Sequence, residues 1–124
     1  MVSRKVFVLP TRTSHSIRPG LNRLFGMDLL NGSEIIHIFD THWVDFSNNE
    51  LFNIALARVR EIVSGCGNCE FYLVLAGSSY LALLVYEAMK RVLGRSFGIL
   101  VWDGNRHRYL LKRPPEVVLN AYLP

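Results

Sequence analysis

The sequence predicts an α/β fold: a three-layer sandwich around a mostly parallel sheet, with an antiparallel C-terminal hairpin at the sheet edge. Residues 71–75 are an unbroken apolar run of strand-forming residues, short enough for one strand that is buried on both faces. A turn of small residues at 77–79 leads into a long helical pattern that ends at Gly94. Asp103-Gly104 is a strong hairpin signal between two apolar stretches. Together these features predict half of a βαβ crossover followed by a hairpin.

Length and composition indicate one globular domain spanning residues 1–124. A chain of 124 residues can bury a core without needing disulfides. Half of the residues are hydrophobic and 19% are charged, which excludes a disordered polymer. The net charge of +4 and the sequence pI of about 9.4 favour an anionic partner without naming one.

The apolar runs of the chain are short. None approaches the roughly 20 residues that a membrane-spanning helix needs. The first residues lead directly into a strand-like stretch at 6–9, which leaves no room for a signal peptide. We therefore expect a cytoplasmic protein that has no membrane partner.

The first predicted strand is residues 5–9, which Pro10 is expected to stop. The loop that follows, residues 11–19, is nearly all hydroxylic or cationic. One interpretation is a solvated loop in which a Ser or Thr caps a short helix around residues 21–25. The other is a ligand site, because the loop follows the first strand and ligands bind beyond the carboxyl ends of parallel strands.

Several side chains in this loop suit a phosphate ligand. Arg12 and Arg18 can offer forked guanidinium donors to phosphate oxygens. His15 is the residue of the loop that can exchange a proton near neutral pH. The hydroxyls that can add hydrogen bonds belong to Thr11, Thr13, Ser14 and Ser16.

A second strand is predicted at residues 34–39. His37 alternates with apolar neighbours there, which favours a packed histidine over a catalytic one. At the carboxyl end of this strand, His42 and Trp43 could flank a bound base, because aromatic faces stack on any nucleobase. Trp43 fits the core or an interface equally well.

The next element is an amphipathic helix with a scaffold role. Ser47 and Glu50 have the spacing of a capping box, just before apolar residues that recur at helical spacing over 51–63. Ser64 and Gly65 are expected to end this helix.

Cys66 and Cys69 follow the helix and precede the central strand. A structural zinc site needs four ligands, and the sequence has no second cysteine pair and no His-x3-His. A thioredoxin-like dithiol stands at the start of a helix, which is the opposite polarity. These observations disfavour metal binding and redox catalysis, and they favour a turn that can form a local disulfide.

The chain closes with a hairpin, in which residues 97–102 run outward and residues 106–111 return antiparallel. Its tip should lie at the carboxyl ends of the parallel strands, so Arg106 and His107 could reach the same crevice as the first loop. Arg108 alternates with His107, and only one of these two is expected to face the crevice.

The predicted order β-α-β-α-β-α-β-β describes a Rossmann-like sheet, followed by an apolar tail at 117–123 that covers a sheet face or a partner subunit. No G-x-G-x-x-G, Walker A or G-x-S-x-G motif occurs. The expected rim offers no paired carboxylates beyond Asp40 and Asp103. What remains there is cationic, hydroxylic, aromatic and histidine-bearing, which suits a phosphodiester better than a hydrophobic metabolite.

This layout resembles the small CRISPR-associated Rossmann-like proteins of type III systems, the ring nucleases and the related CARF sensor domains. The resemblance rests on the Ser14-His15 loop, residues 43–49, residues 75–79 with the apolar helix behind them, and residues 98–104. It implies a homodimer whose two crevices join to hold a cyclic oligoadenylate. In the nuclease members it also implies cleavage without metal or cofactor.

The chemistry implied is in-line attack of a ribose 2′-OH on the adjacent phosphorus, leaving a 2′,3′-cyclic phosphate. The protein has to fix that geometry, donate hydrogen bonds to the phosphoryl oxygens and move a proton. The catalytic candidates are His15 as general acid or base, Arg12 and Arg18 as electrostatic stabilisers, and Ser78 in the phosphate cradle. The ligand-binding candidates are Thr11, Ser14, His42, Trp43, Gly77, Ser79 and Arg106.

Two other classes of function fit the same residues. A sensor or sponge would hold a cyclic nucleotide without cutting it, and only the positioning of the ligand separates it from a nuclease. A dimeric interaction protein would use the apolar tail, with the crevice vestigial. None of the three requires a metal, a cofactor or duplex nucleic acid.

Overall fold

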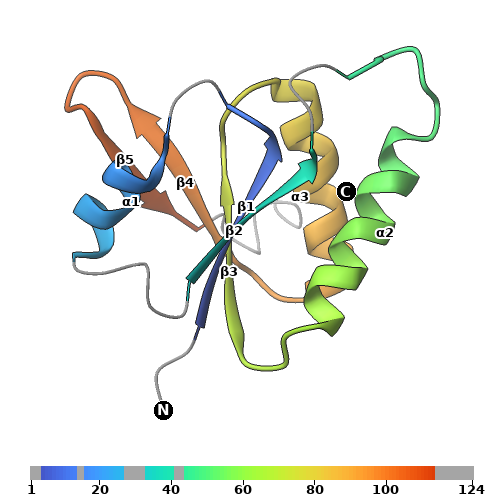
Figure 1. The fold of residues 1–124 in the computed structure, drawn as a ribbon, viewed down its shortest axis with the longest axis horizontal. Coiled ribbons are helices and arrows are strands. Elements are labelled where there is room, and N and C mark those ends of the chain that lie inside the picture. Colours follow the sequence, from blue (N-terminus) through green and yellow to red (C-terminus); the bar gives the residue numbers. More distant parts are fainter. Residues whose placement is uncertain (1–3, 14–15, 27–32, 41–43, 114–124) are drawn as a thin grey trace, which may run out of the picture.

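The computed structural model describes residues 4–13, 16–26, 33–40 and 44–113. Its strands and helices follow the predicted order (Figure 1). They are β1 (Arg4–Thr11), α1 (Arg18–Phe25), β2 (Ser33–Phe39), α2 (Leu51–Ser64), β3 (Cys69–Val74), α3 (Ser79–Leu93), β4 (Gly98–Asp103) and β5 (Arg108–Lys112).

The strands form one five-stranded sheet in the order β2-β1-β3-β4-β5. β1 is parallel to both neighbours, so that Val6 pairs with Glu34 of β2 and with Phe71 of β3. β3 and β4 are also parallel, and only β5 runs antiparallel, at the edge. The predicted α/β sandwich and the central position of β3 are therefore confirmed.

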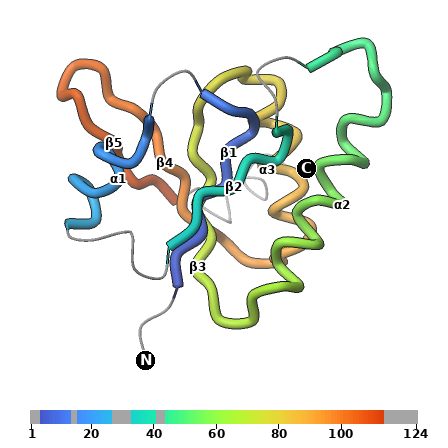
Figure 2. Tube along the Cα trace, in the orientation of Figure 1, coloured from blue at the N-terminus to red at the C-terminus, as the bar shows by residue number. Residues whose placement is uncertain are grey.

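The helices lie on both faces of the sheet, with α1 on one side and α2 and α3 on the other (Figures 1 and 2). β1 shows how the sequence divides its side chains between two cores. Val8 packs with Leu73 in the core under α2 and α3, whereas the adjacent Phe7 packs with Leu21 and Tyr72 in the core under α1. This alternation follows from the two-residue period of a strand, and it explains why residues 6–10 of β1 and 71–74 of β3 are apolar on both faces.

β1 continues through Pro10 to Thr11, so the prediction that Pro10 stops the strand is wrong. Pro10 is buried and falls between Leu9 and Thr11, which pair with His37 and Phe39 of β2. Proline has no backbone N–H to donate, and it is tolerated so close to the end of a strand, where few hydrogen bonds to the neighbouring strands remain. The extra residues bring Thr11 to the rim of the sheet as a buried polar residue.

The predicted capping box is also absent. The backbone N–H and the hydroxyl of Ser47 donate to Asp45 Oδ1, at 3.0 and 2.6 Å, and Glu50 occupies the N-cap of α2 without a side-chain cap bond. These hydrogen bonds lower the pKa of the Asp45 carboxyl, chiefly through the Ser47 hydroxyl. The ends of both long helices are as predicted: α2 stops at Ser64, and Gly94 caps α3 with a left-handed φ of 64°.

The hairpin loop is longer than its Asp-Gly signal predicts, and β5 begins at Arg108 rather than at residue 106. The Asp103 carboxylate accepts hydrogen bonds from the backbone N–H of Asn105 and of Arg106, at 3.0 and 3.4 Å. These bonds stabilise a four-residue connection instead of a two-residue turn, and His107 takes a positive φ of 52° to rejoin the strand.

Cys66 and Cys69 form a disulfide between the end of α2 and the start of β3, as the local-disulfide interpretation predicts. Within the described residues, no group of three or more His, Cys, Asp or Glu side chains is arranged to hold a metal ion. The described helices include none with the length and hydropathy needed to cross a membrane.

Candidate functional site

A cleft of about 950 Å³ opens where β1 and β3 end side by side. β1 continues into a helix on one face of the sheet and β3 into a helix on the other, so the cleft lies at the point where the strand order reverses. This is the position at which open α/β sheets bind ligands. The floor consists of Thr11 at the end of β1 with Arg12 and Thr13 behind it, and of Ala76, Gly77 and Ser78 after β3.

The turn after β3 has a backbone that only a small residue allows. Gly77 has φ +78°, and a Cβ on it would lie 2.9 Å from Thr11 Oγ1. Ser78 then caps α3, and its Oγ accepts a hydrogen bond of 3.4 Å from the N–H of Leu81. Because the first turn of a helix leaves backbone N–H groups without intrahelical acceptors, this end of α3 is suited to an anion.

One wall of the cleft is aromatic and comes from α1 and the hairpin. Trp102 and Tyr109 are cross-strand partners in β4 and β5, and their rings lie 5.1 Å apart at 72°. Gly20 lets α1 press against this pair, since a Cβ there would lie 2.8 Å from the Tyr109 ring. Trp102 keeps 47% of its surface exposed, which leaves ring area for a ligand.

The opposite wall comes from the segment before α2 and the first turn of α3. Val44, Phe46 and Leu81 line it. Phe46 is 56% exposed and makes an edge contact with Tyr80, with the ring centroids 5.9 Å apart. The cleft therefore has an exposed aromatic ring on each side of a polar floor.

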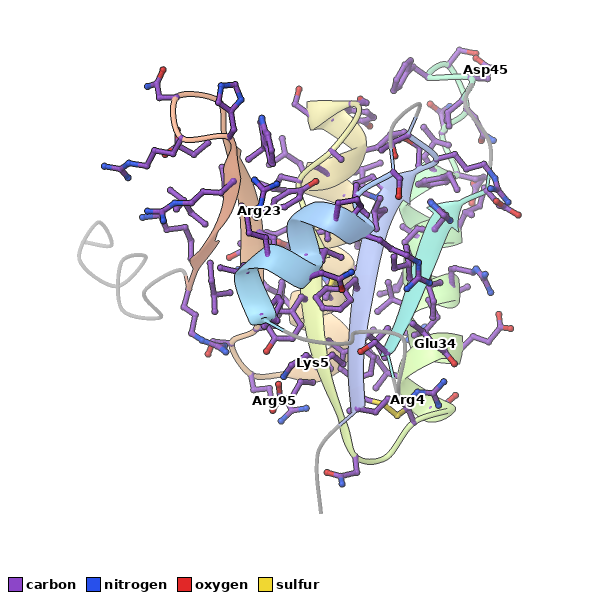
Figure 3. The ribbon with its side chains drawn as sticks, turned by 60° about the vertical axis from the view of Figure 1, so that its left-hand side comes forward. Arg4, Lys5, Arg23, Glu34, Asp45 and Arg95 are labelled. Carbon is purple, nitrogen blue, oxygen red and sulfur yellow. A yellow bond between two sulfur atoms is a disulfide. The ribbon has the colours of Figure 1, made fainter. Side chains whose placement is uncertain are left out.

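Two arginines bring positive charge to the cleft. Arg12 Nε lies 2.5 Å from Asp40 Oδ1 at the end of β2, and both side chains are about half exposed. Arg23 of α1 donates from Nη1 to the carbonyl oxygen of His107 at 2.8 Å, which ties α1 to the hairpin (Figure 3). A guanidinium has five N–H donors, so each arginine keeps donors beyond these contacts.

The structure gathers part of the predicted site at the cleft. Thr11, Arg12, Gly77 and Ser78 all line it. Arg18, Ser79 and Arg106 are not among the described lining residues: Arg18 begins α1, Ser79 is exposed at the start of α3, and Arg106 pairs with Asp103 at 3.5 Å. The remaining candidates, Ser14, His15, His42 and Trp43, lie outside the described residues.

Sequence reasoning missed the aromatic wall and the second arginine. Trp102 and Tyr109 flank the Asp-Gly signal. Had the loop been taken as four residues long, the antiparallel register would have paired these two residues on one face of the hairpin. Arg23 had no such signal, because its role depends on where α1 packs. Phe46 reaches the cleft through an irregular segment that no periodicity describes.

The described lining has little acid–base chemistry of its own. It contains no carboxyl, imidazole or thiol group. Its tyrosine, Tyr109, is buried, and burial raises the pKa of its hydroxyl and keeps the group protonated. These residues can bind, orient and neutralise a ligand, and a proton transfer would have to involve another group.

Comparisons with protein-family models, with curated proteins and with solved structures found no match to this chain.

Proposed function

We propose that the cleft binds a nucleotide phosphodiester, and that this ligand is a cyclic oligoadenylate. The observation that carries the proposal is the combination of a floor that holds hydroxyl and guanidinium donors with an exposed aromatic ring on either side. A phosphodiester with attached bases needs both features at once.

The phosphate is assigned to the floor. Ser78 and the backbone of the first turn of α3 offer hydrogen-bond donors, and Arg12 offers a forked cation next to them. Gly77 lets the Thr11 side chain lie against the turn after β3, because a Cβ on Gly77 would be 2.9 Å from Thr11 Oγ1. The glycine and the serine after β3 thus have separate roles in one phosphate site.

The bases are assigned to the walls. Stacking of a base on an aromatic side chain contributes roughly 1–3 kcal/mol, and Trp102 and Phe46 are exposed enough to stack. Small-molecule sites usually measure about 300–1,000 Å³. The volume of about 950 Å³ is near the upper end of this range, which favours a ligand larger than one nucleotide.

The resemblance to CARF sensors and ring nucleases supports the cyclic oligoadenylate among the possible phosphodiesters. It also supports a homodimer in which two clefts hold one ligand, and a cytoplasmic location. The Cys66–Cys69 disulfide counts against a reducing cytosol, where thiols are normally kept reduced.

Cleavage is the second part of the proposal. The described lining residues can hold a phosphate for in-line attack by a 2′-OH, and His15, in the loop after β1, is the proposed proton-transfer group. Replacement of His15 by Ala should then slow cleavage by roughly 10²–10⁴ while binding is largely kept. A sensor or sponge has no turnover to lose.

Incubation with cyclic tetra-adenylate and cyclic hexa-adenylate, with and without EDTA, tests the proposal by chromatography. Cleavage in EDTA supports the nuclease, whereas binding without cleavage supports the sensor. If neither ring is bound or cut, the cyclic oligoadenylate assignment is wrong, and an interaction protein becomes the better account.

A further inference from the structure

The β4–β5 hairpin has apolar side chains that the described helices leave partly exposed. Ile99 packs against the core under α2 and α3, so the alternation of β4 places Val101 on the same side of the sheet. Leu110 is the cross-strand partner of Val101 and lies on that side too. Within the described residues, Val101 and Leu110 are partly exposed and pack against neither core. We call this pair the hairpin strip.

The opposite side of the hairpin is covered, and the comparison shows that the strip lacks a layer. Leu100 and Tyr109, one residue away in each strand, are buried in the core under α1. β3 contributes side chains to both cores and is buried throughout residues 71–74. β4 has a similar apolar run over residues 99–102, which is the pattern of a strand covered on both faces. Figure 1 shows β5 at the left of the molecule and α2 and α3 toward the right, which explains why the strip keeps surface exposed.

The chain itself leads to this strip. β5 ends at Lys112, whose Cα partner is Ile99 on the same side, and the described residues end one residue later. Residues 114–124 therefore begin beside the strip, and Glu116 is their single charged residue. In a helix, Glu116 and Asn120 would share one side, because residues four apart lie one above the other. The apolar positions around them are Val117, Val118, Leu119, Ala121, Tyr122 and Leu123.

Length and charge favour these residues as the occupant of the strip. Eight residues of helix span about 12 Å, and the four steps of β5 from Arg108 to Lys112 span about 13 Å. Arg108 and Lys112 are exposed on the same side of β5 as the strip, where they can face the Glu116 carboxylate. A second copy bound about a two-fold axis would instead bring the same two cations against each other.

We propose that residues 116–123 dock on the hairpin strip of the same chain and form its missing layer. This gives the apolar tail the role of covering a sheet face rather than that of contacting a partner subunit. The strip lies on the other side of the sheet from Trp102 and Tyr109, which line the cleft. The docking is therefore independent of what the cleft binds.

Nuclear Overhauser spectroscopy of the isotopically labelled full-length protein tests this contact. Methyl cross peaks are expected from residues 117–119 to Val101 and Leu110. They should persist when the labelled chain is mixed with an excess of unlabelled chain, because both groups belong to one molecule. Cross peaks between labelled and unlabelled chains would place a second copy on the strip and overturn the proposal. A lack of cross peaks from the tail to the strip would overturn it as well.

Three variants of the full chain sharpen the test. Leu110→Asp should abolish the cross peaks from residues 117 and 118 and release the tail amides to fast hydrogen exchange, since docking would bury a carboxylate. Leu119→Asp should do the same without altering any residue of the sheet, so the test holds even if Leu110→Asp fails to fold. The matched control is Leu111→Asp, one residue along β5, whose partner Leu100 lies in the core under α1. Persistence of the cross peaks in Leu119→Asp, or their loss in a folded Leu111→Asp, would contradict docking on the strip.

Discussion

The two faces of the sheet are covered unequally, and the difference separates scaffold from site. On one face α2 and α3, of 14 and 15 residues, bury a broad apolar core and pair most of their charges with one another. On the other face α1 has eight residues and covers a smaller core. The short helix leaves Trp102 partly uncovered and the cleft beside it open. Stability is expected to depend mainly on the first face, whereas the second face supplies the wall of the cleft that contains Trp102 and Tyr109.

The largest expected effect compares two fully buried leucines, one in each core. Leu73→Ala should cost about 3–5 kcal/mol, and Leu21→Ala about 2–3 kcal/mol, because one short helix can relax further around the cavity than two long ones. Urea unfolding of both variants measures the difference. An equal or larger loss for Leu21→Ala would show that the α1 layer is as rigid as the other.

The next effect concerns binding rather than stability. Arg12→Ala should weaken binding of a cyclic oligoadenylate about ten- to a hundredfold, since a charge-assisted phosphate contact contributes roughly 1.5–3 kcal/mol. Arg60→Ala, which removes an exposed charge from α2, should bind like the parent. Titration of the cyclic oligoadenylate into both variants shows whether binding depends on the position of the removed positive charge or only on the net charge.

Ser78→Ala is a less specific probe of the site than Arg12→Ala. Ser78 Oγ caps α3, so its removal should cost about 0.5–2 kcal/mol of stability in addition to any loss of binding. Arg12→Ala, in contrast, should leave the melting temperature close to that of the parent, because the Arg12–Asp40 pair is exposed.

Reduction of the disulfide should have a moderate effect confined to stability. Chain-entropy arguments give about 2 kcal/mol for a loop as short as Cys66–Cys69. The disulfide lies at the amino end of β3, and the cleft lies at the carboxyl end, so binding should not change. Unfolding with and without dithiothreitol measures the effect, and the double variant Cys66→Ser, Cys69→Ser is the control that should show no dependence on reductant.

The smallest effect is on the pH dependence of stability. Hydrogen bonds from Lys5 and then from Tyr72 lower the pKa of Glu70 below its usual 4.5. The folded state then binds this proton less readily than the unfolded state, so the contribution is present above pH 4.5 and is lost as the pH falls through the folded pKa. Thermal unfolding of Glu70→Gln should depend less on pH in that acidic range. If the stability of Glu70→Gln changes with pH in the same way as that of the parent, the exposed Lys5–Glu70 pair contributes nothing measurable to stability.

Much of the fold could be predicted from local sequence. The apolar run at 71–75, the glycine at the end of α3 and the apolar run at 6–9 each specify one element almost independently of the others. Besides the strand end wrongly expected at Pro10, the errors lie where a side chain forms hydrogen bonds with a neighbour other than the expected one. Ser47 bonds to Asp45 rather than to the helix, and Asp103 extends the hairpin loop.

The site could be predicted only in part. Topology alone brings Thr11, Arg12, Gly77 and Ser78 together, because parallel strands end at one edge of a sheet. The wall that contains Trp102 and Tyr109 depends on how α1 and the hairpin pack against each other, and no pattern within either segment describes that contact. His15 and His42 lie outside the described residues, so their assignment remains a prediction from sequence.

The most direct test of the central claim is calorimetric titration of cyclic tetra-adenylate into the parent protein and into Trp102→Ala. We expect the parent to bind, and removal of the Trp102 ring to weaken binding about five- to 150-fold, as for the loss of one stacked base. Arg60→Ala should match the parent. Failure of the parent to bind cyclic tetra- or hexa-adenylate, or equal binding by Trp102→Ala, would contradict the assignment of this cleft as the nucleotide site.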